Sequence, residues 1–255
     1  MKKTFLLSCL MLAAMPVMAA YTGHVYVDKN KNGVFDQSEK PLAGIKVSDG
    51  LNVVETAADG SFTLPGHERE RFIFITTPSG YKTFNRHYHK IEKKQSGYDF
   101  GLIPYSGRIR KDGSHRYIHI TDTEIFNTEN HADWVNNVHD YARNEQAAFI
   151  IHTGDICYEK GLKAHIKLMN TENMDCPVFY CIGNHDLVKG KYGEELFESI
   201  YGPVYYSFDA GNVHYVVTPM PGGDHAPGYT SDDVCRWLKN DLAHIRPGTP
   251  VVVFN

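Results

Sequence analysis

Three short apolar runs in the second half of the chain constrain the fold most strongly. They occupy residues 118–121, 149–151 and 178–182, and about thirty residues separate each run from the next. Each has the length and apolar character of a buried strand, and each is followed by acidic or amide side chains. This spacing leaves room for a crossover helix between parallel strands. The pattern therefore predicts an α/β domain with its functional side chains at the carboxyl edge of a parallel sheet.

The side chains at the predicted strand ends are of the kind that binds metal ions. They are Asp122 and Glu124, then Asp155, then Asn184, His185 and Asp186. Carboxylate and amide oxygens are the usual ligands of hard divalent cations. A glycine precedes both Asp155 and Asn184, and glycine allows the backbone to turn sharply where a strand ends. We expect the three strand ends to build a single metal centre.

In order, Asp122-x-Glu124, Gly154-Asp155 and Gly183-Asn184-His185-Asp186 resemble the motifs of the calcineurin-like metallophosphoesterases, over about residues 116–255. The resemblance implies a β-sandwich flanked by helices and the hydrolysis of phosphoric monoesters or diesters. It implies two divalent metal ions (Mn, Fe, Mg or Zn), with Asp122, Glu124, Asp155 and Asn184 as ligands. By the same resemblance, His185 faces the substrate and protonates the leaving oxygen or stabilises phosphoryl charge, and Asp186 accepts a hydrogen bond from its imidazole.

The chain departs from the family pattern in two respects. Glu124 stands where the family has a histidine, which favours harder cations over zinc; alternatively, Glu124 caps the next helix. The family's later motifs, a lone His and then Gly-His-x-His, do not occur before Asn255. We therefore expect a C-terminally incomplete phosphoesterase domain, from either a fragment of a longer gene product or a truncated and inactive protein. The alternative function is a non-catalytic periplasmic or cell-surface binding module with a vestigial phosphoesterase domain.

The first residues predict export. Lys2 and Lys3 precede an apolar run from Phe5 to Val17 and a small-residue cleavage site, so residues 1–20 are predicted to be a signal peptide. The mature protein would be periplasmic, secreted or on the cell surface of a bacterium, without a transmembrane segment. The formal net charge is -4 and no basic stripe occurs, so we expect a small phosphoester substrate and no nucleic acid polymer.

Residues 21–105 consist of short alternating runs separated by turn residues, which predicts a small all-β sandwich. This module resembles the immunoglobulin-like modules that precede some secreted bacterial metallophosphoesterases. Residues 106–114, rich in Gly, Arg and Lys, are predicted to be a linker. The phosphoesterase domain would then occupy residues 115–255.

One loop of this module matches the twelve-residue calcium pattern D-x-[DN]-x-[DN]-G-x5-E. Its ligands would be the side chains of Asp28, Asn30, Asn32, Asp36 and Glu39 and the carbonyl of Val34. A strand enters the loop, so it is not a true EF-hand. The alternative is an Asn-Gly turn with solvated charges.

Two further expectations concern the surroundings of the site. Trp134, Val138 and Tyr141 have helical spacing within residues 131–145, so we expect them to pack on the sheet. The Pro- and Gly-rich segment 220–228, which contains Asp224 and His225, is expected to overhang the site.

Overall fold

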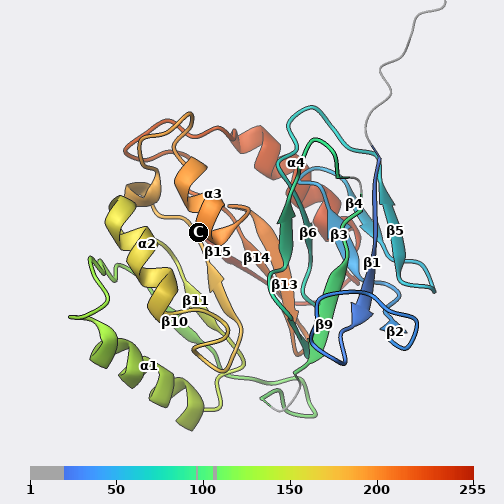
Figure 1. Cartoon of the computed structure of the whole chain (residues 1–255), viewed down its shortest axis with the longest axis horizontal. Coiled ribbons are helices and arrows are strands. Elements are labelled where there is room, and N and C mark those ends of the chain that lie inside the picture. The colour runs from blue at the N-terminus through green and yellow to red at the C-terminus, as the bar shows by residue number, and fades with distance from the viewer. Residues whose placement is uncertain (1–19, 96, 106–107) are drawn as a thin grey trace, which may run out of the picture.

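The computed structural model describes residues 20–95, 97–105 and 108–255. The predicted signal peptide, apart from residue 20, lies outside the described residues. Figure 1 shows an all-β unit on one side of the molecule and an α/β unit on the other. Among the described residues, no helix combines the length and the apolar character that a membrane crossing requires.

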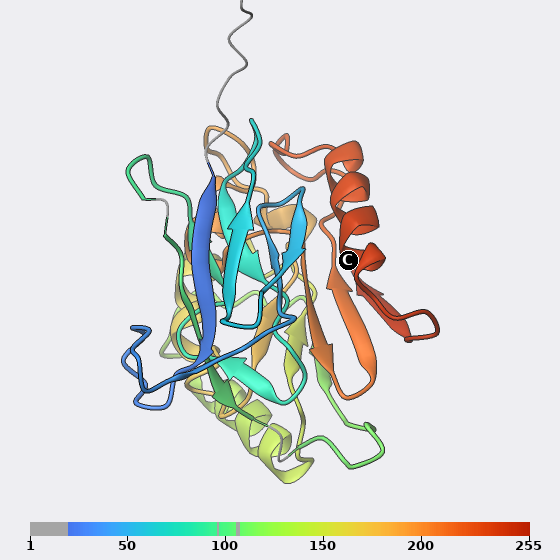
Figure 2. The same cartoon turned by 90° about the vertical axis from the view of Figure 1, so that its right-hand side faces the viewer.

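Two sheets make up the first unit, as Figure 2 shows from its own side. One sheet has the order β2-β1-β9-β7, and β5 pairs with β1; the other has the order β4-β3-β6-β8. The strands of the first sheet are β1 (Tyr21–Val27), β2 (Lys40–Pro41), β5 (Ser61–Leu64), β7 (Tyr81–Thr83) and β9 (Phe100–Pro104). Those of the second are β3 (Lys46–Ser48), β4 (Val53–Glu55), β6 (Phe72–Ile75) and β8 (Tyr88–Lys90).

The two sheets enclose an apolar core. Val25 and Leu102 from the first sheet and Val47 and Ile73 from the second are fully buried in one cluster. These residues alternate with more exposed ones along most of the strands, as expected for sheets with one face on a core. The elements that the structure describes between Tyr21 and Pro104 are all β-strands.

The α/β unit begins with a parallel sheet of order β10-β11-β12. Its strands are β10 (Ile118–Ile120), β11 (Ile150–His152) and β12 (Val178–Tyr180), with the crossover helices α1 (Ala132–Asn144) and α2 (Tyr158–Leu168) between them. The three predicted strands and their parallel order are confirmed.

A second sheet of order β13-β14-β15 packs against the first. The ring of Phe179 stacks on that of Phe208 with centroids 3.7 Å apart, and Phe149 meets Tyr215 at 4.9 Å. The remaining elements are η1 (Asn184–Asp186), α3 (Glu195–Tyr201), β13 (Tyr206–Ala210), β14 (Val213–Val217), α4 (Ser231–Ala243) and β15 (Val251–Phe254). The unit is thus two facing sheets with helices outside, consistent with the predicted α/β fold.

Helix α1 packs on the sheet with a different face from the one predicted. Val135 and Ala142 are buried, whereas Trp134 is 39% and Tyr141 60% exposed. Val138 lies between the predicted apolar face and the buried one and is partly buried. The expectation that Trp134 and Tyr141 pack on the sheet was wrong.

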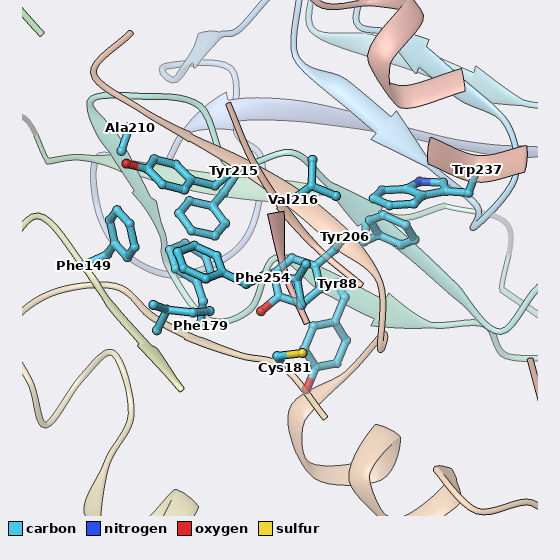
Figure 3. Packing of buried hydrophobic residues seen from close by; sticks show 14 of the residues in the cluster. Tyr88, Phe149, Phe179, Cys181, Tyr206, Ala210, Tyr215, Val216, Trp237 and Phe254 are labelled. Atoms are coloured by element: carbon cyan, nitrogen blue, oxygen red, sulfur yellow. The ribbon is translucent and has the colours of Figure 1, made fainter. Parts of the chain in front are cut away.

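The two units share a hydrophobic core. Phe72 and Phe74 of β6 are buried in the same cluster as Phe149, Phe208 and Trp237 of the α/β unit, part of which is shown in Figure 3. Along β6 the side chains alternate in direction, so Ile73 and Ile75 fill the core of the all-β unit instead. The short run Phe72–Ile75 therefore serves both cores.

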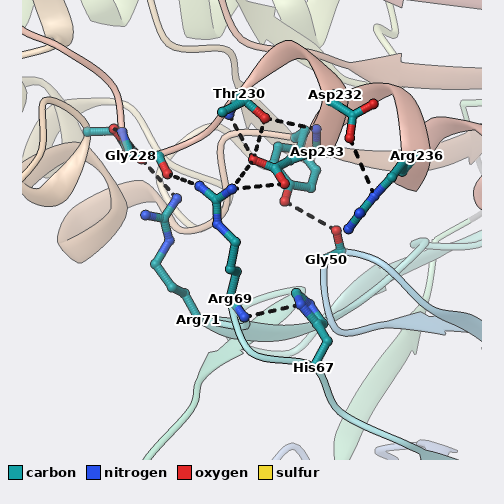
Figure 4. A network of polar contacts seen from close by, with 11 residues as sticks. Gly50, His67, Arg69, Arg71, Gly228, Thr230, Asp232, Asp233 and Arg236 are labelled. Atoms are coloured by element: carbon teal, nitrogen blue, oxygen red, sulfur yellow. Dashed lines mark hydrogen bonds and ion pairs between the residues drawn. The ribbon is translucent and has the colours of Figure 1, made fainter.

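Polar contacts also join the units (Figure 4). Arg69 donates to the carbonyl of Gly228 at 2.8 Å and pairs with Asp233 at 2.9 Å. Arg71 lies 2.8 Å from Glu194 and 2.9 Å from Glu198. The backbone N–H of Asp209 donates to the carbonyl of Thr77 at 2.9 Å.

The predicted linker, residues 106–114, is described from residue 108 onward. Arg108 donates to the carbonyl of Ala147 at 3.0 Å, and Asn212 donates to the carbonyl of Asp112 at 2.9 Å. The described part of this segment therefore lies against the α/β unit.

Candidate metal and phosphate site

The three motif-bearing strand ends meet at one edge of the parallel sheet. Ile120 pairs in register with His152, which pairs with Tyr180, so the strands end side by side. The chain then continues to Asp122, Asp155 and Asn184. Because parallel strands end at the same edge, these residues enter one region of the surface, as the sequence predicts.

Close backbone packing holds the loops together. The N–H of Asp122 donates to the carbonyl of Gly154 at 3.1 Å. A Cβ atom on Gly154 would lie 2.2 Å from the nitrogen of Gly183, and one on Gly183 would lie 2.1 Å from the nitrogen of Asp155. Any side chain at these two positions would force the loops apart. The glycines of the two motifs are therefore required by packing.

The same loops are strained. Asp122, Glu124 and Asp155 have φ angles of 53°, 44° and 52°, in the left-handed region that non-glycine residues rarely adopt. Cys157 and Tyr158 follow with 74° and 56°. Such conformations cost about 1–3 kcal/mol each and cluster at functional sites.

The site carries uncompensated negative charge. No ion pair involves Asp122, Glu124 or Asp155 within the part of the chain that the structure describes. Burial raises the pKa of the Cys157 thiol to about 12, and the nearby carboxylates of Glu124, Asp186, Asp155 and Asp122 add to the shift. Several carboxylates at one edge of a sheet without a cationic partner suit divalent metal ions.

The ligand atoms of Asp122, Glu124 and Asp155 are not all within the 4.8 Å that would bring them around one ion. Asp122 instead accepts a hydrogen bond from the Thr121 hydroxyl at 2.6 Å. The structure thus brings the predicted residues to one edge, without gathering them around a single point.

His185 has a different partner from the one predicted. Its Nδ1 lies 2.9 Å from Oδ2 of Asp224, and this hydrogen bond raises the pKa of the imidazole. Asp186 is fully buried and accepts backbone N–H bonds from Gly183, Ile156 and Cys157 at 2.9–3.3 Å. Burial nevertheless raises the pKa of Asp186. The carboxylate that orients His185 is therefore Asp224, while Asp186 holds the turn.

The segment around Asp224 lies against the site, in agreement with the expected overhang of residues 220–228. The N–H of Asp224 donates to the carbonyl of Asn184 at 3.1 Å, and the N–H of Gly193 donates to that of Ala226 at 2.8 Å. Asp224 was predicted only as a member of this loop. Asp224 lies 39 positions after His185 in the sequence, and no motif spacing indicates the pair.

Two buried histidines support the loop that carries Asp122 and Glu124. The hydroxyl of Thr123 lies 2.9 Å from Nε2 of His152 and 3.3 Å from Nδ1 of His165, and both imidazoles are fully buried. Burial lowers the pKa of His165 to about 4 and that of His152 well below its usual value, with the neighbouring His165 contributing. The neutral rings hold Thr123, which lies between Asp122 and Glu124.

A second cluster with metal-ligand chemistry lies in the all-β unit. Among the described residues, Asp49, His67 and Glu70 are the one set of His, Cys, Asp or Glu with ligand atoms all within 4.8 Å of one another. These atoms already take part in hydrogen bonds. Asp49 accepts from the backbone of Asn52 at 2.7 Å, and Glu70 accepts from the Tyr21 hydroxyl and the backbone of His67. This donor set is therefore engaged by the protein itself.

Comparison with known families agrees with the motif order. Residues 115–252 match the family described as Calcineurin-like phosphoesterase, and residues 29–104 match the one described as N terminal of Calcineurin-like phosphoesterase. No curated protein matches the chain.

Proposed function

The chain belongs to the calcineurin-like phosphoesterase family, and from this membership we propose that it is a metal-dependent hydrolase of phosphoric esters. The observation that carries the proposal is the convergence of the Asp122, Asp155 and Asn184 loops at one sheet edge, with carboxylates that have no cationic partner among the described residues. The same observation favours an enzyme over a non-catalytic binding module, which would not need these strained loops.

Asp122, Glu124, Asp155 and Asn184 would hold two divalent ions, drawn from Mn, Fe, Mg and Zn. Bound there, such ions lower the pKa of water and neutralise charge on phosphoryl oxygens. Three carboxylates among four ligands favour the harder ions of this set. Asp155 follows the middle strand of the sheet, between the strand ends that carry Asp122 and Asn184.

His185 would act on the substrate side. Asp224 engages Nδ1, and no hydrogen bond to Nε2 occurs within the described ranges, so Nε2 is the atom that would donate a proton to the leaving oxygen. Asp155 accepts a hydrogen bond from the backbone N–H of His185 at 3.1 Å, which couples the position of the imidazole to a metal ligand. Asp186 keeps the turn rigid through its three backbone contacts.

We further propose that the protein is exported, with residues 1–20 as its signal peptide, and acts in the periplasm or at the cell surface. The substrate would be a small phosphoester, because the chain carries a formal net charge of -4 and no basic stripe that could follow a nucleic acid backbone.

The test is turnover of p-nitrophenyl phosphate and its bis ester, with each of the four metals in turn, by a purified chain extended to include the family's later motifs, a lone His and Gly-His-x-His. We expect hydrolysis that a chelator abolishes, and a preference for one ester that separates monoesterase from diesterase activity.

Asp155→Asn should lower kcat at least about 100-fold, because it removes a ligand charge at the centre of the site. Asp59→Asn is the matched control, since Asp59 is an exposed acid in a turn of the all-β unit. Absence of turnover with every metal and both esters, or full activity in Asp155→Asn, would contradict the proposal.

A further inference from the structure

The loop from Asp28 to Glu39 leaves the end of β1 and returns through β2, on the side of the molecule away from β10 to β12 (Figure 1). Its Phe35 packs on the rings of Tyr26 and His24, with centroids 4.9 and 5.0 Å away. The phosphoesterase site makes no use of this loop, although its sequence has the spacing of a calcium-binding loop.

The two carboxylates that open and close the loop are buried without a counter-charge. Asp28 is 1% and Glu39 6% exposed. Asp28 accepts from the backbone N–H of Gly33 at 2.9 Å, and Glu39 accepts from that of Lys29 at 2.9 Å. Within the described residues neither forms an ion pair with Lys, Arg or His. Buried charges in proteins are generally paired or bound to a metal ion, so these two carboxylates, which have only backbone N–H partners, suit a bound cation.

An independent feature points to the same place. Tyr26 is fully buried, and its hydroxyl has no hydrogen-bond partner among the described residues. A methyl group placed on Gly101 would lie 3.0 Å from Oδ2 of Asp28 and 3.2 Å from Oη of Tyr26, so both oxygens face one space. A buried hydroxyl left without a partner costs about 1–3 kcal/mol. A buried hydroxyl without a hydrogen-bond partner among the described residues therefore lies beside the carboxylate that opens the loop.

We propose that this loop binds one calcium ion. The ligands are side-chain oxygens of Asp28, Asn30, Asn32, Asp36 and Glu39 and the carbonyl oxygen of Val34, and a water on the ion supplies the missing partner of Tyr26. Every ligand is an oxygen, which excludes a zinc-type site, and a flexible set of six or more oxygens suits calcium better than magnesium.

Binding must tighten the loop. Asp36 now accepts from the Ser38 hydroxyl at 2.6 Å and from the Asn30 amide at 3.0 Å. The carboxylates of Asp28, Asp36 and Glu39 are not all within 4.8 Å of one another. An ion draws Asp36 and Glu39 toward Asp28 and fixes the segment between β1 and β2. Hydrogen exchange of residues 28–39 should consequently slow when calcium is added.

The experiment is calcium titration of the full chain by calorimetry, with hydrogen exchange of residues 28–39 as the local readout. Asp155→Asn serves as the background, so that ions at the phosphoesterase site contribute least. We expect one calcium ion with a Kd of about 0.1–1 mM, as in extracellular modules, and at least tenfold weaker magnesium binding. Terbium, a calcium substitute, should show luminescence excited through Tyr26.

The loop variants decide the location. Glu39→Gln and, separately, Asp36→Asn should each weaken calcium binding at least tenfold and remove the calcium-dependent protection, whereas the Asp59→Asn control should leave both unchanged. Asp36 is only partly buried and its side-chain contacts are to Asn30 and Ser38 of the same loop, so its substitution should leave the fold intact. No calcium-dependent change in the parent chain, or undiminished binding in both loop variants, overturns the proposal. Because neither readout is hydrolysis, its failure is distinct from a failure of the phosphoesterase proposal.

Discussion

At the residue scale, the Thr123 hydroxyl contributes to stability through hydrogen bonds to two buried imidazoles. It lies between Asp122 and Glu124 and is held by His152 and His165. Thr123→Val keeps the shape but leaves two buried imidazole nitrogens without this partner, which should destabilise the fold by about 1–3 kcal/mol. We also expect kcat to fall about tenfold or more, because the loop that carries Asp122 and Glu124, the two proposed metal ligands, loses its support.

Unfolding by urea and turnover at saturating metal check this prediction. Thr123→Ser, which retains the hydroxyl, should restore most of the activity. Equal losses in Val and Ser variants would show that the hydroxyl is not what matters.

His165 makes stability depend on pH. Its pKa is lowered to about 4 in the folded protein, against about 6.5 when unfolded. The unfolded chain therefore binds more protons in this interval. The stability contributed by the neutral ring is fully present above about pH 6.5 and is lost as the pH falls toward 4, by at most about 1.4 kcal/mol per pH unit.

Urea unfolding of the parent chain and His165→Gln between pH 7.5 and 4.5 measures the effect. The variant should lose stability less steeply on acidification. His139→Gln is the control with the opposite sign, because a hydrogen bond to Asp175 raises the pKa of His139. Parallel curves for the parent and His165→Gln would contradict the assignment.

Sequence predicted the site residues that lie directly after strands, because a strand end and its loop are local in the chain. It could not predict Asp224. The path of a long loop brings Asp224 to His185. The prediction named Asp186 instead, because Asp186 is adjacent to His185 in the sequence. Only the fold shows that the Asp186 carboxylate points inward to three backbone N–H groups.

At the element scale, Arg71, which directly precedes strand β6, connects this strand through Glu194 to the loop of residues 223–228. It pairs with buried Glu194, which in turn accepts the N–H of Gly228 at 2.9 Å. Burial raises the pKa of the second partner, Glu198, to about 7, although Arg71 opposes this. Arg71→Met leaves the two acids without that cation and should destabilise the protein by about 3–5 kcal/mol.

The same substitution should lower kcat, because residues 223–228 lose an anchor while they present Asp224 to His185. Urea unfolding and steady-state kinetics report the two effects. Arg236→Met is a suitable control: Arg236 is exposed and lies 3.9 Å from Asp232, a surface pair that contributes less than about 1 kcal/mol. If both variants behave alike, Arg71 has no special role.

Helix α1 shows why element existence was easier to predict than element orientation. A helix over these residues followed from periodicity alone. Two apolar stripes are possible, however, and both contain Val138. The larger side chains, Trp134 and Tyr141, suggested one stripe, but the sheet selected the smaller Val135 and Ala142, which allow closer packing.

At the scale of the whole molecule, the shared core predicts that the two units unfold together. Phe74 of β6 packs among aromatic residues of the α/β unit, with Trp237 6.2 Å away between ring centroids. Phe74→Ala should destabilise the protein by about 3–5 kcal/mol. Trp fluorescence, which follows the α/β unit, and hydrogen exchange of β1 and β9 should report the same loss.

Phe126→Ala provides the comparison, because Phe126 is 54% exposed and should change stability by less than about 0.5 kcal/mol. Two separate transitions in the parent chain, or a loss confined to one unit in Phe74→Ala, would show that the cores are independent.

The sequence indicated two modules and a linker but not their common core. The run Phe72-Ile73-Phe74-Ile75 predicts a strand with apolar side chains on both faces. Residues of the α/β unit cover the second face of this strand. They lie more than seventy positions away in the sequence, so no local pattern predicts the contact.

Strand β6 therefore limits what protein engineers can do with this chain. If the phosphoesterase unit were fused to another carrier without Phe72 and Phe74, the apolar surface that these side chains cover would be exposed to solvent. Such a patch would promote aggregation. A chimaera must therefore either retain β6 or replace the apolar residues that it covers with hydrophilic ones.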